Sequence, residues 1–540
     1  MKRLRLSALA ALACMAMAAL SAQDNYRIAG TLVNAATGEP VVRGTISLLA
    51  ESDSHTLATT HTDSQGRFSI NHLPAGKYQL TAAKRGYMSA FYDEHEEYSS
   101  AVVTGSTTGS DAFVKVDQLT FNLVPGGVIR GVVTDDSGDP VEAANVRIYQ
   151  KSRDHGMGAR ILAPASAKTD DTGAYEFGNL TPGQYMIAVT ATPWYAKAWR
   201  AAPNEEGSPL DVAYPVTYFD STTEEPAATV IDLEGGSHVE ANITLHAVPA
   251  LHITLPPAGR SNNGEEQESA PQLTQMIFGA PADNQMLITE APRTTRESEF
   301  TGIAPGQYTI EAGDPPRKLT VDLANSQQID AANGVEEASV SGNIFLTSDK
   351  PLKEQLRLVL EPVGSSVPVE MQQGTNSQNH FDFESVPPGR WTLWAANGNK
   401  SLATVALSIN GKKIAGGDFT VADKPLRMDV LLADQLARVT GMVQKDGKGF
   451  PGAMVVLVPQ SPAALHALVR RDQSDTDGTF NLRDVAPGKY TVLAIDDGWD
   501  LDWAKPGVLD RYLKGGVTIN VIGNGGDVVT LAAPVALQPK

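Results

Sequence analysis

Two groups of aromatic residues fall outside the alternating patterns of this sequence and are its candidates for ligand binding. Trp194, Tyr195 and Trp199 form the first group, and Trp499 and Trp503 form the second. Planar aromatic side chains on loops can stack on the pyranose rings of carbohydrates. They can also fold back and cap an apolar core, where their large surface is buried. Both interpretations stay open here, and core capping is the one we favour.

Acidic turns are the second group of residues that could do chemistry. Asp170-Asp171 and Asp475-Thr476-Asp477 could supply oxygen ligands to calcium. A full calcium loop, however, needs more carboxylates at regular spacing and usually a distal glutamate. Aspartate also starts turns by accepting hydrogen bonds from nearby backbone amides. We therefore favour a structural role for these aspartates and predict no metal site.

The patterns of known catalytic centres are missing from the sequence. None of the ten histidines is followed three residues later by Glu or His, as a zinc carboxypeptidase site requires. The Gly-x-Ser-x-Gly elbow, the P-loop and the dinucleotide-binding glycine fingerprint are also absent. We therefore predict no catalytic residue and no cofactor. A hydrolase with an unrecognised site remains an alternative, because 62 acidic residues could pair in three dimensions.

A strand–turn–strand signature recurs five times and organises the chain. Each copy has an apolar residue, Pro-Gly or a close variant, one polar residue, an aromatic residue and an alternating strand. The copies are LPAGKYQLTA from Leu73, LTPGQYMIAV from Leu180, IAPGQYTIEA from Ile303, VPPGRWTLWA from Val386 and VAPGKYTVLA from Val485. Proline fixes φ and glycine accepts positive φ, so we expect a tight turn at each copy. The glycines expected to serve these turns are Gly76, Gly183, Gly306, Gly389 and Gly488.

A second signature precedes the first in four of the five copies. It reads TDSQGRF ending at Phe68, TDDTGAY at Tyr175, TNSQNHF at Phe381 and SDTDGTF at Phe480. The fifth position should adopt a left-handed backbone, which favours glycine and, after it, asparagine. The residues at this position are Gly66, Gly173, Asn379 and Gly478. The remaining copy, TTRESEF ending at Phe300, lacks the turn, which indicates a degenerate module.

The spacing of the signatures predicts an all-β chain of tandem antiparallel β-sandwich modules of the prealbumin or immunoglobulin type. Successive signature glycines lie 83 to 123 residues apart, the size of a small sandwich domain. The expected division is a leader at 1–22 and modules at 23–126, 127–249 (with an aromatic insertion), 250–335 (degenerate), 336–435 and 436–540. Short linkers such as Pro125-Gly126-Gly127 favour a rod-like arrangement of these modules.

These motifs resemble the carboxypeptidase regulatory-like domain, a transthyretin-like sandwich grouped with carbohydrate-binding-like folds. The second module matches the family pattern best, from Ile129-Arg130-Gly131 through Pro140-Val141 to Tyr185. The first and fifth modules match nearly as well, the fourth moderately and the third poorly. The resemblance implies a multi-module exported bacterial protein that carries the regulatory module without the enzyme.

The first residues have the composition of a cleaved export signal. Lys2, Arg3 and Arg5 precede an apolar stretch, and small residues before Gln23 suggest cleavage between Ser21 and Gln23. Removing the leader leaves 40 basic and 62 acidic residues, a formal charge of −22, which argues against nucleic acid as a partner. Apart from the leader, no run of about 18 or more apolar residues predicts a membrane helix.

Together these features lead us to expect a non-catalytic exported scaffold or binding protein, located in the periplasm, in the medium or at the cell surface. Its expected role is adhesion or interaction in the cell envelope, with a glycan or an envelope protein as partner. Carbohydrate binding through the loop aromatic residues is the alternative. The sequence does not fix the oligomeric state.

Overall fold

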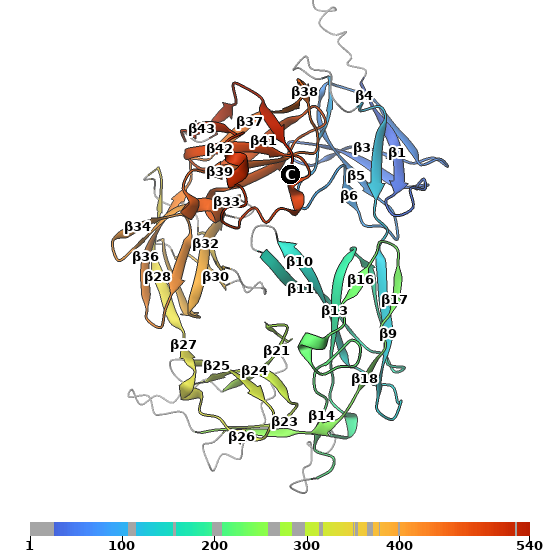
Figure 1. The fold of residues 1–540 in the computed structure, drawn as a ribbon, viewed down its shortest axis with the longest axis vertical. Coiled ribbons are helices and arrows are strands. Elements are labelled where there is room, and N and C mark those ends of the chain that lie inside the picture. Colours follow the sequence, from blue (N-terminus) through green and yellow to red (C-terminus); the bar gives the residue numbers. More distant parts are fainter. Residues whose placement is uncertain are drawn as a thin grey trace, which may run out of the picture.

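The chain folds into five groups of β-strands that follow one another around a ring (Figure 1). The computed structural model describes residues 26–105, 115–154, 158–196, 208–256, 271–282, 298–312, 317–348, 350, 355–363, 371–376, 379–397, 400–523 and 526–540. The expected leader lies outside these residues. Each group has an apolar core of its own, and we call the groups modules 1 to 5 in chain order. Among the described residues, no helix is long and apolar enough to cross a membrane.

Module 1 is a two-layer sandwich around Ile28, Leu48 and Phe121. Its strands are β1 (Tyr26–Asn34), β2 (Thr45–Ala50), β3 (Thr56–His61), β4 (Arg67–Leu73), β5 (Gly76–Ala83), β6 (Ala90–Phe91), β7 (Val102–Thr104) and β8 (Leu119–Leu123). One layer has the order β4-β1-β8 and the other β3-β2-β5-β6, with β7 also on β5. In β8 every second side chain is buried, so the alternation in the sequence directs one face into the core.

Module 2 repeats this plan and adds a long insertion after its tyrosine strand. Its strands are β9 (Gly127–Asp135), β10 (Asn145–Asp154), β11 (Gly158–Lys168), β12 (Ala174–Leu180), β13 (Gly183–Thr190), β14 (Val212–Ala213), β15 (Thr217–Tyr218), β16 (Ile231–Leu233), β17 (His238–Glu240) and β18 (Ile243–Leu245), with the 3-10 helix η1 (Glu225–Ala227). The layers are β12-β9-β17 and β11-β10-β13-β15, and β14 pairs with the linker strand β19 (Val248–Pro249).

Module 3 is the smallest of the five, as its degenerate signature suggests. Its elements are β20 (Leu251–Leu255), β21 (Gln272–Ile277), β22 (Ala280–Pro281), β23 (Ser298–Ile303), β24 (Gly306–Ala312), β25 (Arg317–Leu323), β26 (Gln327–Gln328), η2 (Ala331–Asn333) and β27 (Val335–Glu336). Its layers are β23-β20-β26 and β22-β21-β24-β25-β27.

In modules 4 and 5 one strand pairs with both layers, so each module is a single curled sheet. Module 4 comprises β28 (Ala338–Leu346), β29 (Arg357–Pro362), β30 (Met371–Gly374), β31 (His380–Val386), β32 (Gly389–Asn397), β33 (Lys400–Ile409), β34 (Lys412–Ala415), β35 (Asp418–Val421) and β36 (Leu426–Ala433). Module 5 comprises β37 (Ala437–Lys445), β38 (Lys448–Gly449), β39 (Met454–Pro459), η3 (Pro462–Ala464), α3 (Leu465–Leu468), β40 (Arg470–Gln473), β41 (Thr479–Val485), β42 (Gly488–Ile495), η4 (Gly498–Asp500), α4 (Asp510–Leu513), β43 (Val517–Val521), β44 (Val528–Thr530) and β45 (Val535–Gln538). The shared strands are β33 and β45.

The opening strand of each module departs from the expected antiparallel plan. The opening strand pairs in parallel with a closing strand, as β1 does with β8 and β28 with β36. The glycine of the opening strand permits this close approach. A Cβ atom placed on Gly342 would lie 1.6 Å from the carbonyl oxygen of Met428, and one on Gly131 would lie 2.0 Å from that of Ala241. The repeated opening-strand glycine therefore marks where the closing strand crosses it.

The aromatic residue of the first signature anchors the turn that precedes it. In all five copies its polar atom donates to the backbone carbonyl four residues earlier, at 2.7 to 2.9 Å. The pairs are Tyr78 with Pro74, Tyr185 with Thr181, Tyr308 with Ala304, Trp391 with Pro387 and Tyr490 with Ala486. The indole Nε1 of Trp391 replaces the tyrosine hydroxyl, which explains why tryptophan is accepted in module 4.

The glycines of the first signature fall into two groups. Gly183, Gly306 and Gly389 have the expected positive φ, at 151° to 157°, whereas Gly76 and Gly488 do not. At Gly488 a Cβ atom would lie 3.2 Å from the ring of Tyr490. The glycine there leaves room for the aromatic ring to fold back over the turn. The second signature has the expected geometry, with φ of 61° at Asn379 and 71° to 85° at Gly66, Gly173 and Gly478.

The ring differs from the rod that the short linkers suggested. Figure 1 shows the C-terminal module, in red, beside the blue N-terminal module. The chain curves because neighbouring modules contact one another through specific side chains. At the junction of modules 2 and 3, for example, Phe278 inserts between Tyr149 and Tyr218, and its amide donates to Glu225 at 2.7 Å. Short linkers limit the separation of modules but do not set the angle between them.

Candidate functional site

The contact between modules 5 and 1 is formed by a turn whose equivalent is exposed in modules 1 and 2. In modules 1 and 2 the middle of the second signature, residues 63–65 and 170–172, is exposed to solvent. In module 5 the whole run from Gln473 to Gly478 is buried. We call the contact of this run and its neighbours with module 1 the clasp. It is the candidate functional site, because it contains predicted candidates from both groups of residues.

The signature aspartate changes its hydrogen-bond partners at the clasp. Asp63 accepts the amides of the residues two and four positions further along its own turn, and Asp170 does the same. Asp475 instead accepts the amide of Ala101 at 2.8 Å and the ammonium of Lys77 at 2.5 Å, both from module 1. Asp477 takes over the local role, since its carboxylate accepts the amide of Thr479 at 3.0 Å. The extra aspartate in SDTDGTF thus frees Asp475 for docking.

Thr476 extends the docking along the backbone of module 1. Its amide donates to the carbonyl of Ala101 at 3.0 Å, and its hydroxyl accepts the amide of Val103 at 2.9 Å. The turn of module 5 therefore forms hydrogen bonds with the backbone at strand β7 of module 1, much as a neighbouring strand would. Such bonds fix position and direction, because backbone donors and acceptors must both be satisfied when they are buried.

Gln473 connects the turn to the insertion that follows the tyrosine strand of module 1. Its side-chain amide donates to the hydroxyl of Ser100 at 2.8 Å and to Asp93, and its oxygen lies 3.0 Å from Nδ1 of His95. The Ser100 hydroxyl also lies 2.9 Å from the carbonyl of Ser474. Four side chains are thus joined in one partly buried polar network across the two modules, with Gln473 and Ser100 as its buried members.

An aromatic layer covers this network. Trp499 stacks on His95, with ring centroids 5.2 Å apart and planes 9° apart, and on Tyr98 at 5.8 Å. The guanidinium of Arg471 lies 5.1 Å from the centroid of Tyr98 and 4.8 Å from that of Trp503. Arg471 also pairs with Glu96 at 2.8 Å. A cation between two aromatic rings and a carboxylate is favourable when it is largely removed from water, as Arg471 is.

Four ion pairs cross the clasp among the described residues, and they set its electrostatics. They join Lys77 to Asp475, Glu51 to Arg483, and Arg471 to both Glu96 and Glu97. Burial raises the pKa of Asp475 to about 6, although Lys77 and the Ala101 amide lower it. Burial lowers the pKa of Lys77, but the charge and hydrogen bond of Asp475, together with the charges of Asp477 and Glu51, outweigh burial and raise it overall. The two groups form an ion pair across the contact.

The aromatic residues that we considered for ligand binding lie in two different environments. Trp499 and Trp503 lie in a buried cluster with Tyr512 and Leu509. These two tryptophans therefore cap an apolar core, which is the interpretation we favoured. Trp499 also borders a cleft of about 290 Å³ at the edge of the clasp. Trp194 is 80% exposed.

Of the other two aromatic candidates, one has a described position. Tyr195 meets the ring of Trp194 edge-on at 5.7 Å. Trp199 lies outside the described residues.

Neither acidic turn forms a metal centre in the described part of the chain. No group of three or more His, Cys, Asp or Glu side chains there could hold an ion. The partners of Asp170 are its own turn amides and the Thr172 hydroxyl. These hydrogen bonds lower its pKa.

Sequence reasoning missed the module 1 half of the clasp. His95, Tyr98 and Lys77 were not among its candidates. The available signal was the segment AFYDEHEEYSSAVV from Ala90, which is rich in aromatic and acidic residues and follows the tyrosine strand. The insertions that contain Trp194 in module 2 and Trp499 in module 5 follow the tyrosine strand in the same way.

Comparison with known proteins identifies the first two modules. The family model of the carboxypeptidase regulatory-like domain matches residues 27–109 and 128–217. Colossin-A from Dictyostelium discoideum is 23% identical over 396 residues, which cover 67% of this chain and 3% of that protein. The chain therefore spans only a small fraction of the length of this curated relative.

Comparison with solved structures gives matches of low identity and low TM-score. The Bacillus anthracis TIE protein is 10% identical, with 96% of this chain and 75% of that chain covered and a TM-score of 0.18. A streptococcal ancillary pilin is 12% identical, with 57% and 98% covered and a TM-score of 0.19. The minor pilin GBS52 of Streptococcus agalactiae is 14% identical, with 44% and 100% covered and a TM-score of 0.19. TM-scores this low do not indicate a common overall structure, so the fold assignment follows from the strands themselves.

The chain thus contains two carboxypeptidase regulatory-like domains within an all-β ring.

Proposed function

We propose that the chain is a non-catalytic exported scaffold whose modules are held in a closed ring and present their outer surfaces for interaction in the cell envelope. The observation that carries this proposal is that buried charged side chains pair across the contacts between modules. Among the described residues, Glu337, Asp475 and Asp477 are buried, and the side chain of Arg471 is nearly so. Glu337, Asp475 and Arg471 each pair with a residue of a neighbouring module, and Asp477 supports the turn that carries Asp475. These buried charges therefore join modules.

Glu337 illustrates the pattern away from the clasp. It is the single residue between β27 of module 3 and β28 of module 4. Its carboxylate pairs with Lys318 of module 3 at 2.9 Å and accepts the hydroxyl of Ser385 of module 4. A buried carboxylate with partners on both sides fixes the angle between the modules, because either module alone would leave it unsatisfied.

The proposal is tested by turnover and by location. The purified mature chain should show no turnover on a broad panel of esters, peptides and glycosides. Turnover that a point substitution abolishes would show that the chain is an enzyme. In cell fractionation, the protein should leave the cytoplasm with its first residue between Ser21 and Gln23, and retention of an uncut chain inside the cell would contradict export.

Carbohydrate binding is the second candidate function, and the exposure of Trp194 favours it. An indole that is 80% exposed can offer its ring face to a sugar. Replacing Trp194 with Ala should remove any glycan-array signal of the wild type. Phe345, an aromatic residue on module 4 that is 52% exposed, provides the matched control, Phe345→Ala. A signal that survives Trp194→Ala would rule out this aromatic pair as the sugar platform.

A further inference from the structure

The clasp joins two different surfaces of one chain, and this has a consequence for assembly. The surface of module 1 presents Lys77, Glu96 and the backbone of 101–103, whereas that of module 5 presents Arg471, Asp475 and Thr476. A contact between unlike surfaces closes into a ring or continues into an open chain, depending on which copy supplies each surface. Here both surfaces come from the same copy.

We propose that module 1 also receives module 5 of a second copy of this chain, through the residues of the clasp, so that the protein assembles head to tail when its ring opens. This inference deepens the proposed scaffold function by naming a partner, and it rests on the ring closure. It requires no surface beyond those already in contact.

The buried turn of module 5 is the first argument for this partner. In the ring, Asp475, Thr476 and Gln473 all have their polar groups satisfied by module 1. An opened ring leaves these groups without their partners. Water can replace some of the bonds, but only another module 1 offers the same backbone donors, the ammonium of Lys77 and the serine hydroxyl in one arrangement.

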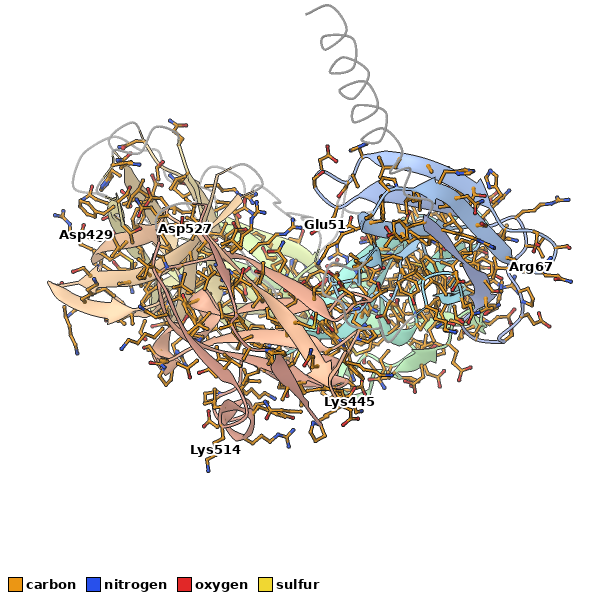
Figure 2. All side chains as sticks on the ribbon, turned by 90° about the horizontal axis from the view of Figure 1, so that it is seen from above. Glu51, Arg67, Asp429, Lys445, Lys514 and Asp527 are labelled. Atoms are coloured by element: carbon orange, nitrogen blue, oxygen red, sulfur yellow. The ribbon has the colours of Figure 1, made fainter. Side chains whose placement is uncertain are left out.

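The distribution of charge is the second argument, and it specifies direction. Glu51 and Glu96 of module 1 face Arg483 and Arg471 of module 5, and Lys77 faces Asp475. Figure 2 shows Glu51 on the side of module 1 that is turned towards module 5, whereas Arg67 points away. Two module 1 surfaces would bring acidic residues together, and two module 5 surfaces would bring arginines together. Complementary charges therefore favour head-to-tail contact over contact between like surfaces.

Closure within one chain should dominate in dilute solution. The intervening modules keep the two surfaces near each other, with an effective concentration on the order of millimolar by analogy with short linkers. Contact between copies then requires the clasp within each chain to open. We expect monomers at micromolar concentration, and linked copies when many chains open and close together.

Charge reversal separates the two modes of contact. Lys77→Asp and Asp475→Lys each place like charges across the clasp within their own chain, so each variant alone should be an open monomer. In a 1:1 mixture, opposite charges meet only between copies, and one pair of chains can form both clasps. Light scattering coupled to size exclusion should show a heterodimer in the mixture only. The double variant Lys77→Asp/Asp475→Lys, which restores opposite charges within one chain, should be a monomer.

A mixture that stays monomeric while the double variant closes would overturn head-to-tail assembly. Small-angle scattering of the wild type keeps this failure distinct from that of the ring, because an extended wild type would contradict ring closure itself. Reversed charges can also fail to restore the buried contact, and a second measurement then decides. Wild-type chains refolded at increasing protein concentration should give a growing fraction of dimers and larger species, and monomers alone at every concentration would refute the proposal.

Discussion

At the scale of the residue, the same motif position serves different ends in different modules. Asp63 and Asp170 close their own turns at the surface, while Asp475 binds module 1. The difference arises from one neighbouring residue, Asp477, which takes over the local hydrogen bond. A motif that reads as purely structural in the sequence has therefore acquired a docking role without losing its turn.

The contrast gives a matched pair of substitutions. Asp475→Asn keeps an oxygen for the Ala101 amide but loses the charge opposite Lys77, so we expect the clasp to weaken by about 2 kcal/mol. Asp63→Asn changes the equivalent exposed turn and should have little effect on ring closure. Chemical denaturation and small-angle scattering of both variants check this. Equal effects at the two positions would show that the Lys77 contact contributes nothing specific.

The aromatic anchor of the first signature can be tested by removing one oxygen. Tyr490→Phe keeps the ring but leaves the buried carbonyl of Ala486 without its donor at 2.8 Å. The expected loss of unfolding free energy is about 1–3 kcal/mol. Tyr26→Phe, at a partly exposed position on β1, is the control and should change the melting temperature little. An unchanged melting temperature in Tyr490→Phe would mean that the ring alone holds the turn.

His252 makes the junction of modules 2 and 3 sensitive to pH. Burial lowers its pKa, but hydrogen bonds to the carboxylates of Asp211 and Glu299 outweigh burial and raise it. A raised pKa means that the charged form is favoured in the folded state. The stabilisation is therefore complete below the ordinary pKa of about 6.5 and disappears as pH rises through the raised value.

The melting temperatures of wild type and His252→Gln should accordingly differ at pH 6 and converge at pH 9. A difference that stays constant across this range would show that His252 contributes through packing and not through charge.

At the scale of the element, the strands could be predicted but their closing partners could not. Alternation and the turn signatures place strands such as β8 and the left-handed residue Asn379, because both depend on local geometry. The parallel pairing of β1 with β8 depends on contacts some 90 residues apart, which local patterns do not encode. The insertion at residues 90–103 was missed for the same reason, because His95 and Tyr98 make their ring contacts with module 5.

Asn379 tests how much the left-handed turn matters to module 4. Its φ of 61° is tolerated by asparagine and glycine but costs other residues about 1–2 kcal/mol. We expect Asn379→Gly to be close to neutral and Asn379→Ala to be destabilising by about 1 kcal/mol. Thermal unfolding of the two variants measures this difference in stability. Equal stabilities would mean that the turn relaxes to another conformation.

At the scale of the whole molecule, the junctions between modules rather than their separate cores determine the shape. Each module has its own apolar core, so the modules could in principle have formed a rod. Phe278 in its aromatic socket, His252, Glu337 and the clasp instead fix the angles between neighbours. The sequence could not predict this curvature, because each junction depends on a few side chains from segments far apart in the chain.

Module 5 closes the ring on module 1, and a distance measurement can test this closure. The only cysteine, Cys14, lies in the expected leader, so spin labels on Glu51→Cys and Arg483→Cys report one pair of positions in the mature chain. Replacing this partly exposed ion pair should cost little. Pulsed electron paramagnetic resonance should give a short, narrow distribution of distances between the labels at positions 51 and 483. The control pair, Arg67→Cys with Arg483→Cys, should give a longer distance. A long, broad distribution for the first pair would contradict the closed ring.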